Sequence, residues 1–147
     1  MSNIDIDKNA VISVLNNILE AELAGVVRYT HYALMVFGYN RIPIVSWMRS
    51  QANESLTHAN EAGELITHLD GHPSLGIGPL LETHRHDIGD ILRESLEHET
   101  LALSHYHRLL ELVSDRNILL EEYARVKIAQ EEGHLGEVLK MLKKPGE

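Results

Sequence analysis

The sequence predicts an all-α protein: a four-helix bundle with a long crossover between its second and third helices and no clear fifth helix. Three observations lead to this prediction. Apolar residues recur at steps of three and four in four long segments, the links between these segments read short, long, short, and one Glu-to-His pairing occurs twice at nearly the same separation. A chain of 147 residues can close a substantial apolar core, so we expect residues 1–147 to form a single domain.

The first helix is predicted over residues 9–37. Its apolar positions recur every three or four residues, which places them on one face of a helix. That face consists of Val11, Leu15, Ile18, Glu22, Gly25 and Tyr29. Glu22 therefore lies within an apolar stripe, where an isolated charge would be costly.

The second helix is predicted from Pro43 to about residue 69. Gly38 and Asn40 interrupt the first pattern, and proline suits the first turn of a helix because its missing N–H group needs no partner there. The inner face of this helix carries Ile44, Met48, Gln51, Ser55, His58, Ala62 and Leu65. The short link predicts that the first two helices form an antiparallel hairpin.

A long connection follows, because residues 71–82 contain more glycine and proline than a helix or a central strand tolerates. A third helix is predicted over residues 87–113, and a short turn at 114–117 leads to a fourth that ends near residue 142. The third helix carries Leu92, Leu96, Glu99, Leu103, Tyr106 and Leu110 on one face, and the fourth carries Ala124, Glu131, His134, Val138 and Met141. The long connection can cross back over the length of a bundle.

The repeated pairing joins Glu22 to His58, 36 residues on, and Glu99 to His134, 35 residues on. Each histidine also closes a short cluster with a glutamate three or four residues before it, a spacing that sets both side chains on one side of a helix. Carboxylates combined with neutral imidazoles suit iron or manganese. The sequence contains no cysteine, which excludes thiolate metal sites and disulfides. The pattern predicts one metal centre built from two similar halves.

Burial makes the metal prediction stronger than spacing alone. An uncompensated carboxylate in a protein interior costs several kcal/mol, and four of them together cannot remain ionised unaided. Two divalent cations would neutralise four carboxylates and leave both histidines as neutral ligands. We therefore expect two metal ions per chain.

The net charge of −9 repels phosphate backbones, so we expect no nucleic-acid partner. The first residues show neither the basic region nor the apolar run of a secretory signal, and no stretch approaches the about 18 apolar residues that span a bilayer. These features predict a cytoplasmic protein with no membrane partner.

At the residues of this centre the chain resembles the bacterioferritin branch of the ferritin-like superfamily. The strongest likeness is the segment 129–135, with Glu131 and His134; segments 15–23 and 96–99, which hold Glu22 and Glu99, and the pair His58-Ala59 also match. The resemblance implies a ferroxidase that binds two Fe(II) ions per subunit and passes their electrons to O2 or H2O2. It implies Glu99 and Glu131, with Glu54 as a further candidate, bridging or flanking the ions, Glu22 as a terminal carboxylate, and His58 and His134 as terminal imidazoles. It also implies that Tyr29 lies beside the site as the candidate catalytic residue.

The chain departs from that family at three places. The second helix should supply a glutamate three residues before His58, where this chain has Ser55. Glu54, one residue earlier, is the nearest substitute; it lies about 40° from His58 around the helix, whereas position 55 lies about 60° from His58 on the other side. Leu56 stands where bacterioferritins place the methionine that binds haem, so we expect no haem. The chain ends soon after the fourth helix, so we expect no short fifth helix of the kind that lines the fourfold channels of 24-subunit shells. This expectation allows a smaller shell or a dimer, and the choice among a dimer, a 12-mer and a 24-mer stays open.

Some residues are expected to play no part in the metal centre. His84, His86, His98 and His105 are expected on the crossover surface or an exposed helix face. Apolar residues off the central stripes predict that copies of the chain associate as a homo-oligomer, because a single bundle would expose them. These residues are Ile12, Leu19, Val26 and Val27 on the first helix and Ile42, Val45 and Trp47 around the second.

The sequence leaves several questions of function open. The metal can be iron or manganese, the oxidant O2 or H2O2, and the role iron storage or detoxification. One alternative is a ferritin-like oxidase or peroxide scavenger that forms no storage shell. Another is a non-catalytic helical subunit in which Ser55 marks a degenerate site that holds only a structural ion.

Overall fold

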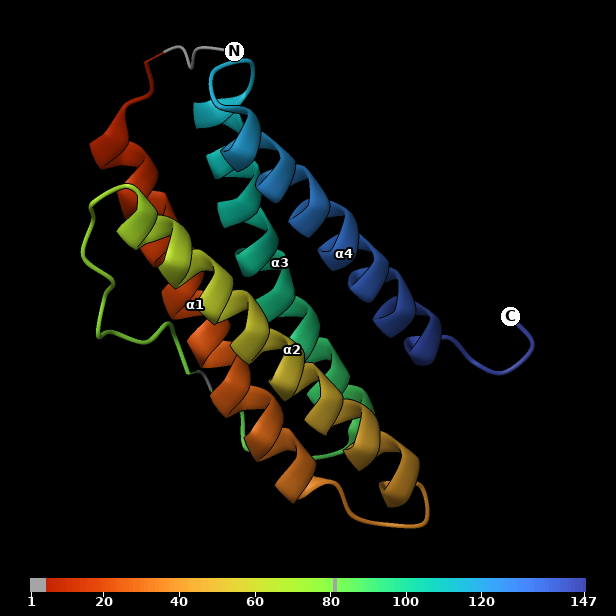
Figure 1. Ribbon diagram of the computed structural model, residues 1–147. Coiled ribbons are helices and arrows are strands. Elements are labelled where there is room, and N and C mark those ends of the chain that lie inside the picture. Colours follow the sequence, from red (N-terminus) through yellow and green to blue (C-terminus); the bar gives the residue numbers. More distant parts are fainter. Residues whose placement is uncertain (1–4, 81) are drawn as a thin grey trace.

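The computed structural model describes residues 5–80 and 82–147, and these form a bundle of four long helices (Figure 1). The helices are α1 (Lys8–Met35), α2 (Arg41–His68), α3 (Ile88–Val113) and α4 (Ile118–Leu142), with no strand in the described residues. The predicted ends lie within two residues of these bounds. The all-α bundle with a long crossover is confirmed, and the described residues after α4 form no further helix.

Three of the helices are capped at their N-termini by aspartate or asparagine side chains, which are common at this position. Asp7, Asp87 and Asn117 each accept a hydrogen bond from a backbone N–H in the first turn of α1, α3 and α4. α1 stops two residues earlier than predicted because Val36 is extended. The Arg41 guanidinium then donates to the carbonyls of Ala33 and Val36, at 3.0 and 2.7 Å, and so satisfies acceptors that the helix end leaves free.

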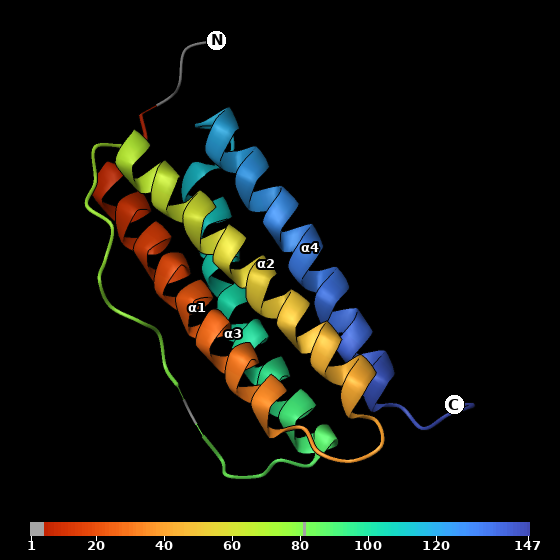
Figure 2. The same ribbon diagram turned by 60° about the horizontal axis from the view of Figure 1, so that its bottom comes forward.

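α1 packs against α2 and α3, and α3 packs against α4. The crossover returns the chain along the length of the bundle, so α3 runs in the same direction as α2 (Figure 1). Its described parts lie alongside α1 on the outside of the bundle in both views (Figure 2).

Several hydrogen bonds fasten the crossover to the bundle. The Gly78 N–H donates to the Glu20 carbonyl at 2.9 Å, and a β-carbon added at Gly78 would lie only 3.0 Å from that oxygen. The Arg28 guanidinium donates to the Pro79 carbonyl at 3.2 Å, and the Thr83 hydroxyl donates to buried Glu94 at 2.8 Å. The path of the crossover along α1 is therefore fixed by specific contacts.

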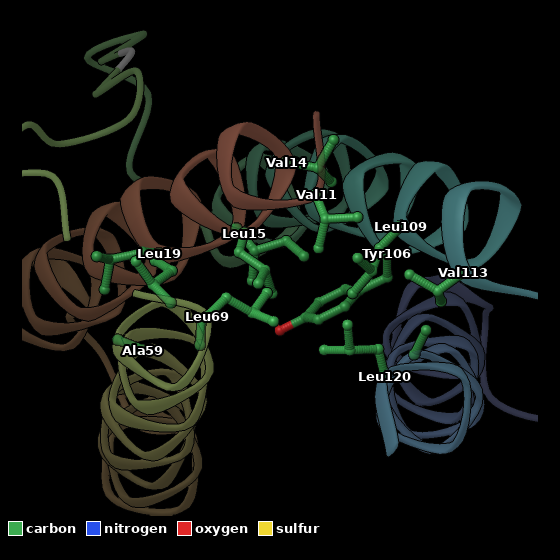
Figure 3. Close-up of a cluster of buried hydrophobic side chains, with 14 residues drawn as sticks. Val11, Val14, Leu15, Leu19, Ala59, Leu69, Tyr106, Leu109, Val113 and Leu120 are labelled. Atoms are coloured by element: carbon green, nitrogen blue, oxygen red, sulfur yellow. The ribbon is translucent and has the colours of Figure 1, made fainter. Parts of the chain in front are cut away.

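The apolar core is divided into two clusters. One contains Val11, Leu15, Ile18, Ala62, Ile66, Tyr106, Leu109, Val113, Leu120 and Ala124, with side chains from all four helices pointing toward one another (Figure 3). The other contains Tyr29, Tyr32, Ala33, Val36, Val45, Met48, Ile91, Leu92 and Val138. Buried carboxylates and imidazoles lie on the same inner helix faces between these clusters along the chain, so the bundle encloses a polar centre within an apolar interior.

The structure corrects parts of the predicted surface. Leu19 and Val45 are buried within their own chain, whereas Val27 and Ile42 are exposed. The sequence predicts Met141 on the inner face of α4, but its side chain is exposed, and Val138 is the last buried residue of this helix. The exposed apolar surface thus differs from the predicted one, and it also includes Leu34, Phe37 and Leu56.

By length and composition α1 could cross a membrane, contrary to the expectation that no stretch would reach that limit. Half of its most apolar window is buried inside the bundle. A central helix of a bundle meets the same criterion, because its inner face must be apolar.

Candidate metal centre

Three side chains from three helices meet inside the bundle: Glu22 of α1, His58 of α2 and Glu131 of α4. All three are buried, and one potential ligand atom from each lies within 4.8 Å of the other two. Nδ1 of His58 is 2.7 Å from Oε2 of Glu22 and 3.5 Å from Oε1 of Glu131. This group brings together half of the predicted ligands.

A second group adjoins it through Tyr29, Glu99 and His134. The Tyr29 hydroxyl donates to Oε1 of Glu99 at 2.8 Å and lies 3.1 Å from Nε2 of His134. The Trp47 ring stacks on His134 with ring centres 5.6 Å apart and an angle of 4° between the planes. Glu99 and His134 are thereby held in place by aromatic neighbours, and Tyr29 lies beside the centre as the family resemblance implies.

Helical spacing explains why these side chains converge. Glu22 and Tyr29 are two turns apart on the inner face of α1, and Glu131 and His134 are one turn apart on α4. Glu131 joins the two groups, because it lies beside His58 on one side and interacts with Glu99 on the other.

The charges of this cluster are poorly compensated by the protein alone. Burial raises the pKa of Glu22, and burial together with the neighbouring Glu131 carboxylate raises the pKa of Glu99 well above its usual range. Burial by itself would lower the pKa of His58, but the carboxylates of Glu131 and Glu22 outweigh it and raise this pKa to about 10. The metal-free centre therefore retains protons.

Two buried oxygens identify what the cluster lacks. Among the described residues, Oε2 of Glu22 and Oε2 of Glu131 have no satisfied hydrogen bond although both atoms are shielded from solvent. Such an acceptor is normally satisfied in a folded protein. Carboxylates and imidazoles are suitable ligands for iron and manganese, so a cation between these side chains fits the donors present.

Glu54 does not join the cluster. Its side chain is 48% exposed, and its Oε1 lies 3.7 Å from Nε2 of His58, the ring nitrogen opposite to the one that faces Glu22. Ser55, which occupies the family's glutamate position, is buried. The second helix thus offers the centre one imidazole and no carboxylate at the usual position.

α1 and α2 approach closely beside this serine. A β-carbon added at Gly25 would lie 2.7 Å from Oγ of Ser55 and 3.2 Å from Nε2 of His98. His98 is buried, which corrects the expectation of an exposed face; the space left by Gly25 admits its ring next to α1. Burial and the charge of Arg28 lower the pKa of His98 to about 4, so it is neutral at physiological pH.

The close approach gives a testable prediction. Gly25→Ala should lower the free energy of unfolding by about 1–2 kcal/mol, since a packed site must expand to admit a methyl group. The matched control is Gly63→Ala on α2, where a β-carbon meets no atom within 4 Å and alanine should be neutral or stabilising. Urea unfolding measures both; a loss at Gly25 that Ser55→Ala does not partly restore would contradict this packing.

Sequence reasoning missed Lys127, a buried cation close to the centre. Its Nζ lies 2.6 Å from Oε2 of Glu61 on α2 and 3.3 Å from the Gln130 side-chain oxygen. Its positive charge lowers the pKa of Glu22, against the larger effect of burial. The sequence contains an indication of this position, because Lys127 lies one helical turn before Glu131 on the same helix and therefore on the same face.

A four-helix bundle with carboxylates and imidazoles converging from all four helices defines the class of bundle proteins that can hold a metal centre in their core. The chain belongs to the ferritin-like family, because the family model described as a ferritin-like domain matches residues 12–145. No curated protein matches the sequence significantly.

Solved structures share the whole fold. A ferritin-like, diiron-carboxylate protein from Bacillus anthracis str. Ames superposes with a TM-score of 0.88 at 23% identity, covering 95% of this chain and 100% of the other. A dodecameric thioferritin from Bacteroides fragilis, described as bacterioferritin-related, gives 0.84 at 22% identity, with 93% and 88% covered. Rhodobacter capsulatus bacterioferritin, with a metal-free dinuclear site and haem iron, gives 0.80 at 24% identity, with 90% and 82% covered.

Proposed function

We propose that the protein binds two Fe(II) ions per chain between its helices and oxidises them with O2 or H2O2. The observation that carries this proposal is the convergence of three buried carboxylates and two imidazoles, Glu22, Glu99, Glu131, His58 and His134, with two buried carboxylate oxygens left unsatisfied. Glu99 and Glu131 bridge or flank the ions, Glu22 is a terminal carboxylate, and the histidines are terminal ligands. The dinuclear chemistry named for the Bacillus anthracis relative supports this assignment.

The electron balance suits a pair of ions. Each Fe(II) loses one electron, and the two electrons together with two protons convert O2 to H2O2, or H2O2 to two molecules of water. The pair His58 and Glu22 holds a proton in the metal-free centre and must release it when the imidazole becomes a ligand. Tyr29 keeps its proton, because burial raises its pKa well above the usual value, and it orients Glu99 through its hydrogen bond.

Storage or detoxification of iron in the cytoplasm is the proposed role. A homo-oligomer is supported by exposed apolar side chains on neighbouring helices, including Val27, Ile42 and Leu56, and by the dodecamer described for the Bacteroides fragilis relative. The absence of haem stays a prediction. A non-catalytic helical subunit that holds a structural ion is the second candidate, and Ser55 in place of a glutamate is the observation that favours it.

The direct test is anaerobic titration of metal-free protein with Fe(II), followed by exposure to air. We expect two Fe(II) per chain to bind and then to oxidise, with oxygen uptake measured in parallel. Retention of at most one ion per chain without oxidation would contradict the proposal and favour a structural ion. Particle size and the amount of iron held beyond two ions per chain separate a storage shell from a small oxidase.

A further inference from the structure

A second group of metal-binding side chains lies outside the bundle core, where the crossover passes α1. His31 is on the outer side of α1, and Glu82 and His86 are on the crossover. Nε2 of His31 is 2.5 Å from Oε2 of Glu82, and Nε2 of His86 is 3.3 Å from Oε1 of the same carboxylate. One potential ligand atom from each residue lies within 4.8 Å of the others.

A second observation at this place points to a missing ligand. Nε2 of His86 is shielded from solvent and has no satisfied hydrogen bond among the described residues, although it lies 3.3 Å from Oε1 of Glu82. Buried polar nitrogens are normally satisfied. An ion seated between the two imidazoles and the carboxylate would give this nitrogen a partner.

The protein holds the three residues near one another without an ion. On one side of Glu82, the Arg28 guanidinium binds the Pro79 carbonyl, and on the other side the Thr83 hydroxyl binds buried Glu94. The His84 N–H donates to Oε1 of Glu82 at 2.7 Å and orients the carboxylate. These contacts reduce the ordering that a bound ion would require.

We propose that His31, Glu82 and His86 form a mononuclear site for a divalent transition-metal ion of the kind that Zn(II) represents. Two imidazoles and one carboxylate are an established ligand set for such ions, and they leave a fourth position open. Ligand atoms about 2.1 Å from a tetrahedral ion lie about 3.4 Å apart. This separation is compatible with the ligand atoms here, which lie within 4.8 Å of one another. The ion links residues 31 and 82, so it fastens the crossover to α1.

This site shares no residue with the proposed iron centre, and its test is arranged to be independent of it. The triple variant His58→Gln/Glu131→Gln/His134→Gln serves as the background, because it removes both imidazoles of the iron centre and the carboxylate that joins its two groups. Zn(II) alone is the probe, and bound metal is counted by calorimetric titration and by elemental analysis after desalting. We expect one Zn(II) per chain in the background, and at least about 100-fold weaker binding when His31→Ala or His86→Ala is added.

The matched control is His72→Gln. His72 is an exposed histidine of the same crossover and does not belong to the group of three, so its replacement should leave Zn(II) binding unchanged. In wild-type protein, His86→Ala should lower the total of bound Zn(II) by one equivalent. Circular dichroism checks that each variant is folded.

Amide hydrogen exchange gives a second readout. Zn(II) should slow exchange in residues 72–87 of the background protein and should have no such effect after His86→Ala. An equivalent of Zn(II) that survives both His31→Ala and His86→Ala would overturn the proposal, and so would a background protein that binds no Zn(II).

Discussion

Glu131→Gln is expected to slow Fe(II) oxidation by at least about 100-fold, because replacing groups that only support metal ligands already costs 10–100-fold. Glutamine keeps the size of the side chain but removes the charge. Glu131 has the largest expected effect because it contacts His58 on one side of the centre and interacts with Glu99 on the other. Its loss should weaken both ion positions.

The neighbouring residue supplies the control. Glu132 differs from Glu131 by one position, and its side chain is 62% exposed, so Glu132→Gln should oxidise Fe(II) at the wild-type rate. Glu54→Gln should slow oxidation by only about 10-fold, because its half-exposed carboxylate lies 3.7 Å from Nε2 of His58 and supports that ligand from outside the cluster. Stopped-flow absorbance after mixing with Fe(II) and O2 measures all four proteins. Similar rates for wild type and Glu131→Gln would place the chemistry elsewhere.

Metal-free protein is expected to become less stable as the pH rises from 7.5 to 9.5. The pKa of His58 is about 10 in the folded state and near 6.5 when unfolded, so the folded chain holds a proton that the unfolded chain has released. The stabilisation is complete below pH 6.5 and is lost as the pH approaches 10. Glu22 and Glu99, whose pKa values are also raised, act in the same direction.

The expected loss is about 2–3 kcal/mol over this range, since one proton over two pH units corresponds to about 2.7 kcal/mol. Thermal unfolding in the presence of a chelator should show it as a fall in Tm of at least about 5 °C. The measurement starts at pH 7.5 because His98 has a lowered pKa. Below pH 7 this residue makes the protein more stable as the pH rises, which is opposite to the effect of His58.

Two further measurements make this result specific. His58→Gln should flatten the pH dependence, whereas the exposed residue His107→Gln should not. Mn(II), which stays divalent in air, should reverse the trend, because binding displaces protons and becomes tighter as the pH rises. A metal-free protein whose stability stays constant or increases from pH 7.5 to 9.5 would show that His58 carries no excess proton.

Helix positions could be predicted from the sequence because long apolar stripes repeat with the helical period, and the ends differ by two residues at most. The residues of the centre could be predicted for the same reason: Glu22, Glu99 and Glu131 interrupt apolar stripes and are buried. Their individual roles as ligands remain a prediction.

The burial of His98 and the exposure of Glu54 depend on packing between helices. Neither could be predicted from the apolar pattern of one helix. His98 is buried because Gly25 on another helix leaves room for its ring, which the pattern of α3 alone does not reveal. Glu54 is one residue from a buried position, and a displacement of that size around the helix leaves it exposed.

The path of the crossover was equally hidden. Glycine and proline mark residues 71–82 as a connection, but its route along α1 is set by contacts such as the one between Gly78 and Glu20. That route brings His31 beside Glu82, 51 residues on. His86, which was expected on the crossover surface, thereby joins His31 and Glu82 in a candidate metal site.

The central claim is that divalent ions neutralise the buried carboxylates of this bundle. A crystal structure of the protein grown with Mn(II) or, without oxygen, with Fe(II) tests it most directly, because anomalous scattering locates and counts the ions. We expect two ions between the four helices, in contact with Glu22, His58, Glu99, Glu131 and His134. An interior without ions, or carboxylates turned toward solvent, would contradict the account.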